Sequence, residues 1–184
     1  YPAYSYGDRT RSFLKVQDGC DYQSSYCTIP LARGKSRNQP IREILEEARL
    51  LGESGVREVI LTGVNIGDFG KTTGESFLEL IQALDQIPGI SRYRISSIEP
   101  NLLHNDILHF VAQSSKFLPH FHIPLQSGSD QILNKMRRRY RRNLFQEKKR
   151  AIRHILPEAL IGADLKEGLR RQDENLFSPP PEFL

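Results

Sequence analysis

Short apolar runs alternate with longer amphipathic runs along most of this chain, and this alternation limits the fold more than any other feature. Residues 40–54 carry apolar side chains at Ile41, Ile44, Ala48 and Leu51, the spacing of one helix face. Strand-like runs occur at 12–17, 56–62, 93–98, 121–125 and 159–164. Further helical patterns occur at 76–87, 105–113, 130–136 and 143–156. Repeated strand-then-helix units predict an α/β fold, in which helices cover a parallel sheet.

A polar loop follows each of the first four predicted strands. These loops are 20–27, 62–70, 97–101 and 126–130. Ligand sites of parallel α/β folds lie at the carboxyl ends of the strands, in open sheets and in barrels alike. We therefore expect all four loops to face one site.

The first of these loops contains both cysteines of the chain, Cys20 and Cys27, with Ser24 between them. Two thiolates are a poor metal site, because zinc and iron–sulfur clusters take three or four protein ligands. His120 and His122 share one face of a predicted strand and could complete the zinc site of an α/β hydrolase, although such histidines more often line a core or a cleft. From spacing alone, two free cysteines are the favoured interpretation.

The wider sequence context changes that interpretation. With Cys in place of Ser24, the loop would have the pattern C-x3-C-x2-C, followed by T-I-P-L-A-R-G. Other motifs follow in order: R-T-R-S-F-L-K-V-Q-D-G-C, L-T-G-V-N-I-G-D-F-G, R-I-S-S-I-E-P-N-L-L, H-F-H-I-P-L-Q-S-G-S-D and M-R-R-R-Y. Over residues 7–164 the chain resembles the radical S-adenosylmethionine methylthiotransferases. Within that family it is most similar to the branch that modifies N6-threonylcarbamoyladenosine at position 37 of tRNA.

The resemblance implies an incomplete (β/α) barrel of the radical S-adenosylmethionine type, truncated after its fifth strand. Residues 11–165 would form this partial core, residues 1–10 a lead-in from a preceding domain, and residues 166–184 an atypical tail rich in polar residues and proline. Where the family continues its fifth strand, this chain has Lys166 and Glu167. Burying these charges would cost several kcal/mol, so we expect either that the strand stops early or that the sequence is altered after Asp164.

The resemblance also implies two cofactors. In the family, three cysteines bind a [4Fe–4S] cluster that an electron donor reduces, and S-adenosylmethionine then yields a 5′-deoxyadenosyl radical for methylthio insertion at C2 of the adenosine. By position, Cys20 and Cys27 would bind the cluster, and Ser24 stands where the third cysteine is missing. No side chain is assigned a catalytic role, because the radical chemistry belongs to the cofactors. The residues expected to contact S-adenosylmethionine are Thr62, Gly63, Asn65, Ser97, Glu99, Gln126 and Ser127.

Ser24 limits what the chain is expected to do. A neutral hydroxyl is a weak ligand for iron–sulfur chemistry, so we expect little cluster and little cleavage of S-adenosylmethionine. We also expect a piece of a longer protein, since the chain begins without Met, and one that lacks the family's second cluster domain and its C-terminal RNA-binding domain. The alternative function is therefore that of a catalytically inactive fragment that binds RNA.

A basic segment at 135–153 supplies the candidates for RNA binding. It has ten Lys or Arg residues and one Glu, whereas the net charge of the whole chain is only +4. Such a segment suits the anticodon stem-loop of tRNA, because arginine binds phosphate with a planar fork of donors. Tyr140 would either stack on a base or pack its ring on the domain. The expected RNA contacts are Arg137, Arg138, Arg139, Arg141 and Arg142.

Composition excludes several other classes of protein. No apolar run approaches the roughly 18 residues needed to cross a bilayer, so no membrane partner is expected. The first residues have no basic-then-apolar signal layout, and two cysteines in 184 residues are too few for a secreted disulfide scaffold. We expect a cytoplasmic protein. Its oligomeric state is unknown from the sequence.

Overall fold

The computed structural model describes residues 11–166 of the chain. The strands are β1 (Arg11–Lys15), β2 (Glu58–Thr62), β3 (Arg92–Ile95), β4 (His120–His122) and β5 (Leu160–Gly162). The helices are α1 (Ile29–Arg33), α2 (Ile41–Glu53), α3 (Phe77–Asp85), α4 (Asn105–Gln113), α5 (Asp130–Lys135) and α6 (Arg142–Ile155), with a 3₁₀ turn at Ile66–Asp68. The predicted lead-in at 1–10 and the tail from 167 onward lie outside the described residues.

The strands follow one another in chain order. β1, β2 and β3 pair in parallel, and β4 pairs in parallel with β5. Isolated bridges join Tyr93 to Phe117 and Ser97 to His122, and the Ile98 amide donates to the His122 carbonyl at 3.1 Å. These contacts join the two sheets at β3 and β4, so all five strands lie in chain order, as in a (β/α) barrel. The prediction of an α/β fold with a parallel sheet is confirmed.

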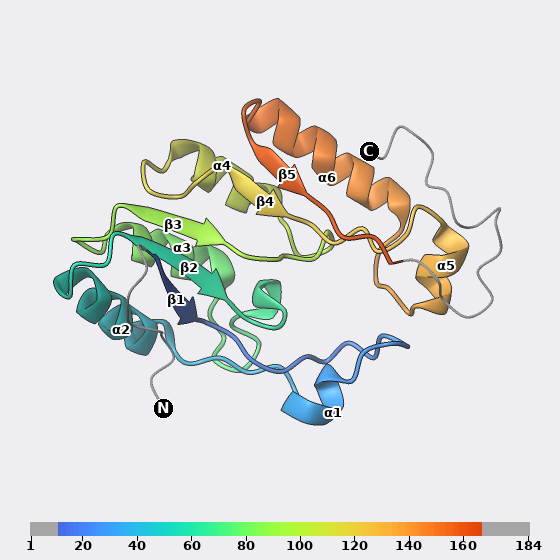
Figure 1. The fold of residues 1–184 in the computed structure, drawn as a ribbon, viewed down its shortest axis with the longest axis horizontal. Helices are drawn as coiled ribbons and strands as arrows, with labels where there is room; N and C mark the ends of the chain where they lie inside the picture. The colour runs from blue at the N-terminus through green and yellow to red at the C-terminus, as the bar shows by residue number, and fades with distance from the viewer. Residues whose placement is uncertain (1–10, 167–184) are drawn as a thin grey trace.

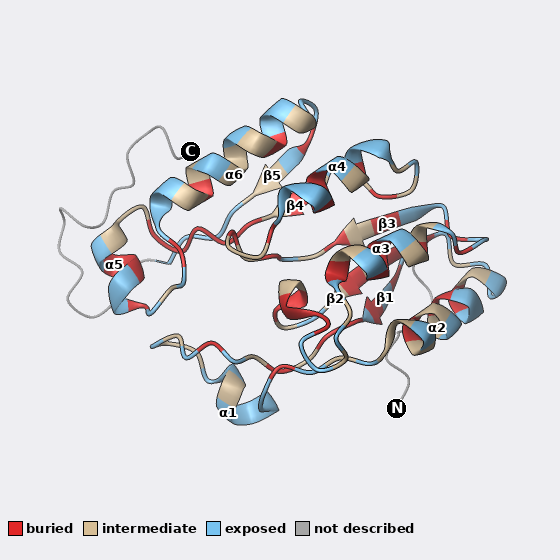
Figure 2. Ribbon diagram, turned by 180° about the vertical axis from the view of Figure 1, so that it is seen from behind, coloured by how far each residue is buried: buried red, intermediate tan, exposed pale blue. Residues whose placement is uncertain are grey.

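Helices cover one face of the sheet. Figure 1 views the strands from the side without helices, and Figure 2, from behind, shows α2, α3, α4 and α6 in front of them. Along β1, Ser12 and Leu14 are buried, whereas Phe13 between them is 46% exposed. Leu14 belongs to the same core as Ile44 and Ala48 of α2. The alternating burial of β1 thus comes from helices on one side only.

The last strands are shorter than their sequence patterns indicate. β4 stops at His122, because Pro124 has no amide hydrogen for a ladder bond. β5 stops at Gly162, and the chain continues with a single bridge between Leu165 and Gln126. Lys166 is exposed. Within the described range, the structure therefore agrees with the expected early stop, and the Lys166 charge is not buried.

Short polar motifs determine where the helices begin. Ser76 starts α3 with a reciprocal capping box: its hydroxyl accepts from the Glu79 amide, and its own amide donates to the Glu79 carboxylate at 2.7 Å. The Ser129 hydroxyl caps α5 in a similar way. Each helix of residues 11–166 is too short or too polar to cross a membrane.

Candidate functional site

Gln17 joins the loops after β1 and β2. Its side chain is buried, and its Oε1 accepts from the amides of Val64 and Asn65 at 2.9 and 2.8 Å. Its Nε2 donates to the Gly19 carbonyl at 2.7 Å and to the Ser36 hydroxyl at 2.9 Å. One buried amide thus holds the start of the cysteine loop against the loop of the T-G-V-N motif.

Two tyrosines of the cysteine loop reach the loops of β3 and β4. The Asn101 side chain donates to the Tyr22 hydroxyl at 2.8 Å, and the Tyr26 hydroxyl donates to Gln126 Oε1 at 2.9 Å. The loops after β2, β3 and β4 therefore each contact the cysteine loop or Gln17 at its start. This is the convergence that a parallel sheet predicts at its carboxyl edge.

A buried ion pair lies among these loops. Arg138 donates to Glu99 Oε1 at 2.5 Å, and the two side chains are only 9% and 14% exposed. Arg138 also donates to the Tyr26 hydroxyl, and its guanidinium lies 5.5 Å and 5.7 Å from the ring centroids of Tyr26 and Tyr140. Burial raises the pKa of Glu99 above its usual range, while the charge and hydrogen bond of Arg138 oppose the rise.

The predicted cofactor residues lie at the strand ends and differ in their exposure. Asn65, Gln126 and Ser127 are buried, Thr62 is partly buried, and Gly63 and Ser97 are exposed. A Cβ atom on Gly63 would lie 2.7 Å from the Ile66 side chain and 3.0 Å from Gln17, so a larger residue would displace the Gln17 contact. Packing at the strand end is therefore enough to explain the glycine.

Gln126 has an unusual backbone. Its φ is +67°, in the left-handed region that non-glycine residues seldom occupy. Its amide donates to the Asp164 carbonyl at 2.7 Å, and its carbonyl accepts from the Lys166 amide at 2.9 Å. These bonds to the chain after β5 hold the strained residue so that its side chain accepts from Tyr26.

Four buried polar atoms at this edge have no partner among the described residues. They are Asn65 Oδ1, Glu99 Oε2, Asn101 Oδ1 and Arg138 Nε. An unpaired buried polar atom costs about 1–3 kcal/mol, so native proteins normally supply a partner. Three acceptors and one donor around the same loops fit a polar ligand that carries both amino and carboxylate or hydroxyl groups.

The cysteines and Ser24 lie in the same loop and are all partly buried. The Tyr22 amide donates to the Cys20 sulfur at 3.4 Å, and Cys20 lines a pocket of about 430 Å³ with Gln23 and Lys35. Burial raises the pKa of the Cys20 thiol, and this rise exceeds the opposing effect of the Tyr22 hydrogen bond. Cys20 therefore has less thiolate character than a free thiol.

The part of the chain that the structure describes has no cluster of side chains large enough to bind a metal ion. No three His, Cys, Asp or Glu side chains of residues 11–166 gather closely enough to hold a metal ion. His122 pairs with Asp164 at 3.2 Å, and His120 lies at the other end of β4. The structure gives the zinc-hydrolase hypothesis no support.

The predicted RNA-binding arginines fall into two groups. Arg137, Arg139, Arg141 and Arg142 are exposed, whereas Arg138 is turned inward to Glu99. Tyr140 is 2% exposed and its hydroxyl donates to the Pro124 carbonyl at 2.6 Å, so its ring packs on the domain. The Arg139 guanidinium lies 4.1 Å from the centroid of the Tyr22 ring. Arg139 therefore lies beside the cysteine loop, whereas Arg138 is turned inward.

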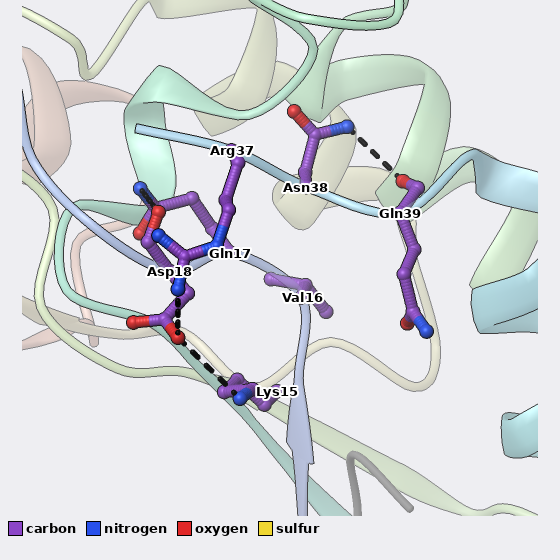
Figure 3. Close-up of a pocket in the computed structure, with 7 residues that line it drawn as sticks. All are labelled: Lys15, Val16, Gln17, Asp18, Arg37, Asn38 and Gln39. Atoms are coloured by element: carbon purple, nitrogen blue, oxygen red, sulfur yellow. Dashed lines mark hydrogen bonds and ion pairs between the residues drawn. The ribbon is translucent and has the colours of Figure 1, made fainter. Parts of the chain in front are cut away.

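A second pocket, of about 290 Å³, lies beside the start of the cysteine loop and is lined by residues 15–18 and 37–39. Figure 3 shows the Asp18 carboxylate between Arg37 and Lys15, at 3.0 and 3.6 Å. The Arg33 guanidinium lies 3.2 Å from the same carboxylate. Burial would raise the pKa of Asp18, but the hydrogen bond from the Gly19 amide and the three basic side chains together lower it. The charged side chains that line this pocket already pair with one another, so we do not assign the pocket to a polar ligand.

Sequence reasoning missed three residues of this site: Gln17, Tyr22 and Tyr26. Gln17 was expected only as the last residue of a strand, and no role was assigned to Tyr22 or Tyr26. A long polar side chain directly after the alternating apolar residues Leu14 and Val16 was the available signal. Its partners lie 47 and 48 residues away, so spacing could not identify them.

Comparison with known proteins identifies the family. The sequence model of the Radical SAM superfamily matches residues 14–159. The chain belongs to the radical SAM superfamily. This match begins in β1 and includes the cysteine loop, β2, β3 and β4 with their loops, and it ends before β5.

Curated relatives cover almost the whole chain. The threonylcarbamoyladenosine tRNA methylthiotransferase MtaB of Thermotoga maritima is 39% identical over 181 residues, which are 98% of this chain and 42% of that relative. MtaB of Bacillus subtilis is 34% identical over 185 residues, 100% of this chain and 41% of that relative. The chain therefore spans less than half the length of these relatives.

A solved radical SAM structure has the same fold. The methyltransferase TsrM from Kitasatospora setae, solved with cobalamin and a [4Fe–4S] cluster, superposes with a TM-score of 0.66. It is 13% identical and covers 83% of this chain and 30% of that chain. At this identity the likeness shows the fold alone, and it confirms the expected radical SAM type of (β/α) architecture.

Radical SAM proteins require a [4Fe–4S] cluster and S-adenosylmethionine, and the two cofactors fit this chain differently. The four unpaired polar atoms at the strand ends suit the amino acid and ribose groups of S-adenosylmethionine. The cluster does not fit, because the loop supplies two thiolates and a serine, and residues 11–166 contain no three-ligand group. The residues present therefore fit S-adenosylmethionine but do not fit a [4Fe–4S] cluster.

Proposed function

We propose that this chain is the radical SAM module of a tRNA methylthiotransferase, whose parent reaction adds a methylthio group to C2 of N6-threonylcarbamoyladenosine at position 37. The observation that carries the proposal is the convergence of four strand-end loops with unpaired polar atoms. The names of the Thermotoga maritima and Bacillus subtilis relatives support the substrate. The partners would be the tRNA anticodon stem-loop and an electron donor. A cytoplasmic setting would keep Cys20 and Cys27 reduced.

In this proposal the chain's own residues bind and orient S-adenosylmethionine, which supplies a 5′-deoxyadenosyl radical when it is bound and reduced. Asn65 and Glu99 present acceptors for the amino group, and Ser97, Gln126 and Ser127 suit hydroxyl or carboxylate groups. Thr62 and Gly63 form the edge of β2 beside them. Arg138 holds the Glu99 carboxylate in place by their ion pair.

Ser24 would prevent the chain from assembling a complete cluster, so the test restores the thiol. The chain and its Ser24→Cys variant are reconstituted anaerobically with iron and sulfide, and metal content is measured per chain. Each is then given S-adenosylmethionine and dithionite, and 5′-deoxyadenosine is quantified. We expect about four irons and measurable 5′-deoxyadenosine only in the variant, since three thiolates leave one iron open to the cofactor.

A Ser25→Cys variant is the matched control, because it adds a thiol one residue away from the family position. If Ser24→Cys gains no more iron than Ser25→Cys, the radical SAM assignment of this loop is wrong. If the unaltered chain already holds four irons, Ser24 does not limit the cluster.

A second function is favoured by the exposed arginines of the basic segment, of which Arg139 lies against Tyr22 of the cysteine loop. Without a complete cluster, the chain would bind RNA without modifying it. Fluorescence anisotropy with an anticodon stem-loop RNA, measured between 50 and 200 mM salt, should show binding that weakens as salt rises, because phosphate contacts release counterions. Replacing Arg141 and Arg142 with Gln should lower both the affinity and the salt dependence. Binding that ignores salt would contradict this function.

A further inference from the structure

The face of the sheet that no helix of residues 11–166 covers carries a cluster of arginines at the end opposite to the cysteine loop. Arg11, Glu58 and Arg92 are neighbours in the parallel register, each at the first position of its strand, and Arg94 lies two residues further along β3. These side chains alternate with residues that face the helices, such as Leu61 and Tyr93. They therefore belong to the face seen in front in Figure 1. A strand of five residues spans roughly 13–17 Å, so this cluster is separate from the strand-end loops.

One carboxylate serves three guanidinium groups in this cluster. Glu58 is 7% exposed, and its carboxylate lies 2.9 Å from Arg94, 3.3 Å from Arg92 and 3.4 Å from Arg11. Burial alone would raise the pKa of Glu58, but the hydrogen bond and charge of Arg94, with the charges of Arg11 and Arg92, lower it. The carboxylate is therefore ionised, and the four side chains carry a net charge of +2.

The arginines have donors to spare. Each approaches Glu58 through Nε, and only the Arg94 contact has hydrogen-bond geometry. Among residues 11–166, the terminal nitrogens of Arg92 and Arg94 donate to no other group. Arg92 and Arg11 are 57% and 55% exposed, and Arg94 is 31% exposed. A planar guanidinium group with unused donors matches the oxygens of a phosphate or carboxylate.

His120 adds a polar atom without a partner beside this cluster. It is the first residue of β4, on the same face of the sheet, and its Nδ1 is buried with no hydrogen-bond partner in the described part of the chain. Burial lowers the pKa of His120, and the charges of Arg94 and His122 contribute to the shift. An anion near Arg94 would offset these charges and accept a proton or hydrogen bond from the imidazole.

We propose that Arg11, Arg92, Arg94 and His120 form an oxyanion site that binds a phosphate group. The alternative is a purely structural ion cluster, called a staple below, in which Glu58 joins three strands and no ligand binds. The two differ in charge: a staple is complete with one carboxylate, whereas a net charge of +2 with free guanidinium forks attracts a second anion. The phosphate is either a free anion or the phosphate of a nucleotide. The site is independent of the methylthiotransferase proposal, since it uses none of the strand-end residues.

Isothermal titration calorimetry in phosphate-free buffer tests the site on the chain as it is. Inorganic phosphate, AMP and adenosine are titrated in turn. We expect saturable binding of phosphate or AMP and none of adenosine. Tighter binding of AMP than of phosphate identifies a nucleotide source, and the reverse identifies the free anion. Absence of saturable binding by both ligands overturns the proposal.

Variants locate the binding. Arg94→Gln should weaken it about tenfold or more, since it removes a charge-assisted contact. Arg42→Gln, on an 83% exposed side chain of α2, and Arg142→Gln, in the basic segment, should leave it unchanged. If Arg142→Gln weakens binding and Arg94→Gln does not, the phosphate binds the basic segment and the proposed site is wrong.

Glu58→Gln separates an anion site from a staple. It removes the single negative charge, so phosphate should bind this variant more tightly and raise its Tm more than that of the unaltered chain. A pure staple would lose stability without any rescue by phosphate, which would contradict the proposal. If Glu58→Gln does not fold, Arg92→Gln decides instead, because a 57% exposed side chain can be changed with little effect on folding. Phosphate should bind Arg92→Gln more weakly than it binds the unaltered chain, and unchanged binding would contradict the proposal.

Discussion

Replacing Arg138 with Met tests whether the ion pair with Glu99 holds the strand-end loops together. Arg138 follows α5 in the chain, and its partners Glu99 and Tyr26 come from the loops after β3 and β1. Methionine keeps an unbranched apolar stem of similar length but removes the charge and the donors. The variant therefore leaves the Glu99 carboxylate buried without a counter-charge.

The exposure of the pair determines the expected magnitude. Exposed ion pairs contribute about 0–1 kcal/mol, whereas removing one partner of a buried pair costs about 3–5 kcal/mol. Side chains that are 9% and 14% exposed belong to the second class. Because Arg138 Nε and Glu99 Oε2 already lack partners among the described residues, we expect the lower end, about 3 kcal/mol. For a domain of this size, that corresponds to a fall in Tm of roughly 6–12 °C.

Urea unfolding followed by circular dichroism measures the effect as a shift in midpoint at constant slope. Arg142→Met is the control: its side chain is 44% exposed and lies 3.7 Å from Asp130, so the loss should stay below about 1 kcal/mol. The double variant Arg138→Met with Glu99→Gln should recover most of the stability, since no uncompensated charge remains. If Arg138→Met costs no more than Arg142→Met, the pair is not buried in solution and the argument fails.

The pH dependence of the Arg138→Met variant has a defined sign. Burial already raises the pKa of Glu99, and losing Arg138 removes the largest opposing influence, so the pKa rises further. Above the ordinary glutamate pKa of about 4.3, the folded variant then binds a proton that the unfolded chain does not. The stability deficit should shrink as pH falls from 7 toward 5 and grow as pH rises through the raised pKa.

Three further variants test local features of the fold by thermal or urea unfolding. Gly19→Ala should destabilise the chain by several kcal/mol or prevent folding, because φ is +70° and a Cβ would lie 2.0 Å from the Lys35 carbonyl; a loss below about 1 kcal/mol would contradict this. Tyr93→Phe should leave stability unchanged or raise it by about 1 kcal/mol, because the buried hydroxyl has no partner in the described residues; a clear loss would mean that a partner exists. Ser76→Ala should cost about 1 kcal/mol, since it removes one half of the capping box with Glu79, and Ser76→Thr should restore most of it.

The alternation of strands and helices was predictable because it depends on local periodicity. Apolar side chains at helical spacing, such as Ile44 and Ala48, pack on the sheet, and the strand ends converge as any parallel sheet requires. The limits of β4 were less predictable. They depend on Pro124 and on pairing with β5, which follows about 40 residues later in the chain.

The roles of Arg138 and Gln17 could not be predicted from the sequence. Arg138 lies in a run of arginines that have the same local composition, and only the tertiary fold turns one of them toward Glu99, 39 residues away. The five arginines therefore had the same predicted role, RNA contact, although Arg138 serves a different one in the structure. Gln17 is a similar case, because its partners are backbone amides of another loop and leave no mark on the sequence.

The loop around Ser24 is held by contacts that do not involve the proposed cluster ligands. The loop is held by Gln17 against Asn65, by Tyr22 against Asn101, and by Tyr26 against Gln126. None of these contacts uses a cysteine or Ser24. The fold of the loop and its capacity to bind iron therefore depend on different residues. In the proposed module, a change at position 24 would therefore alter the capacity to bind iron more than the fold of the loop.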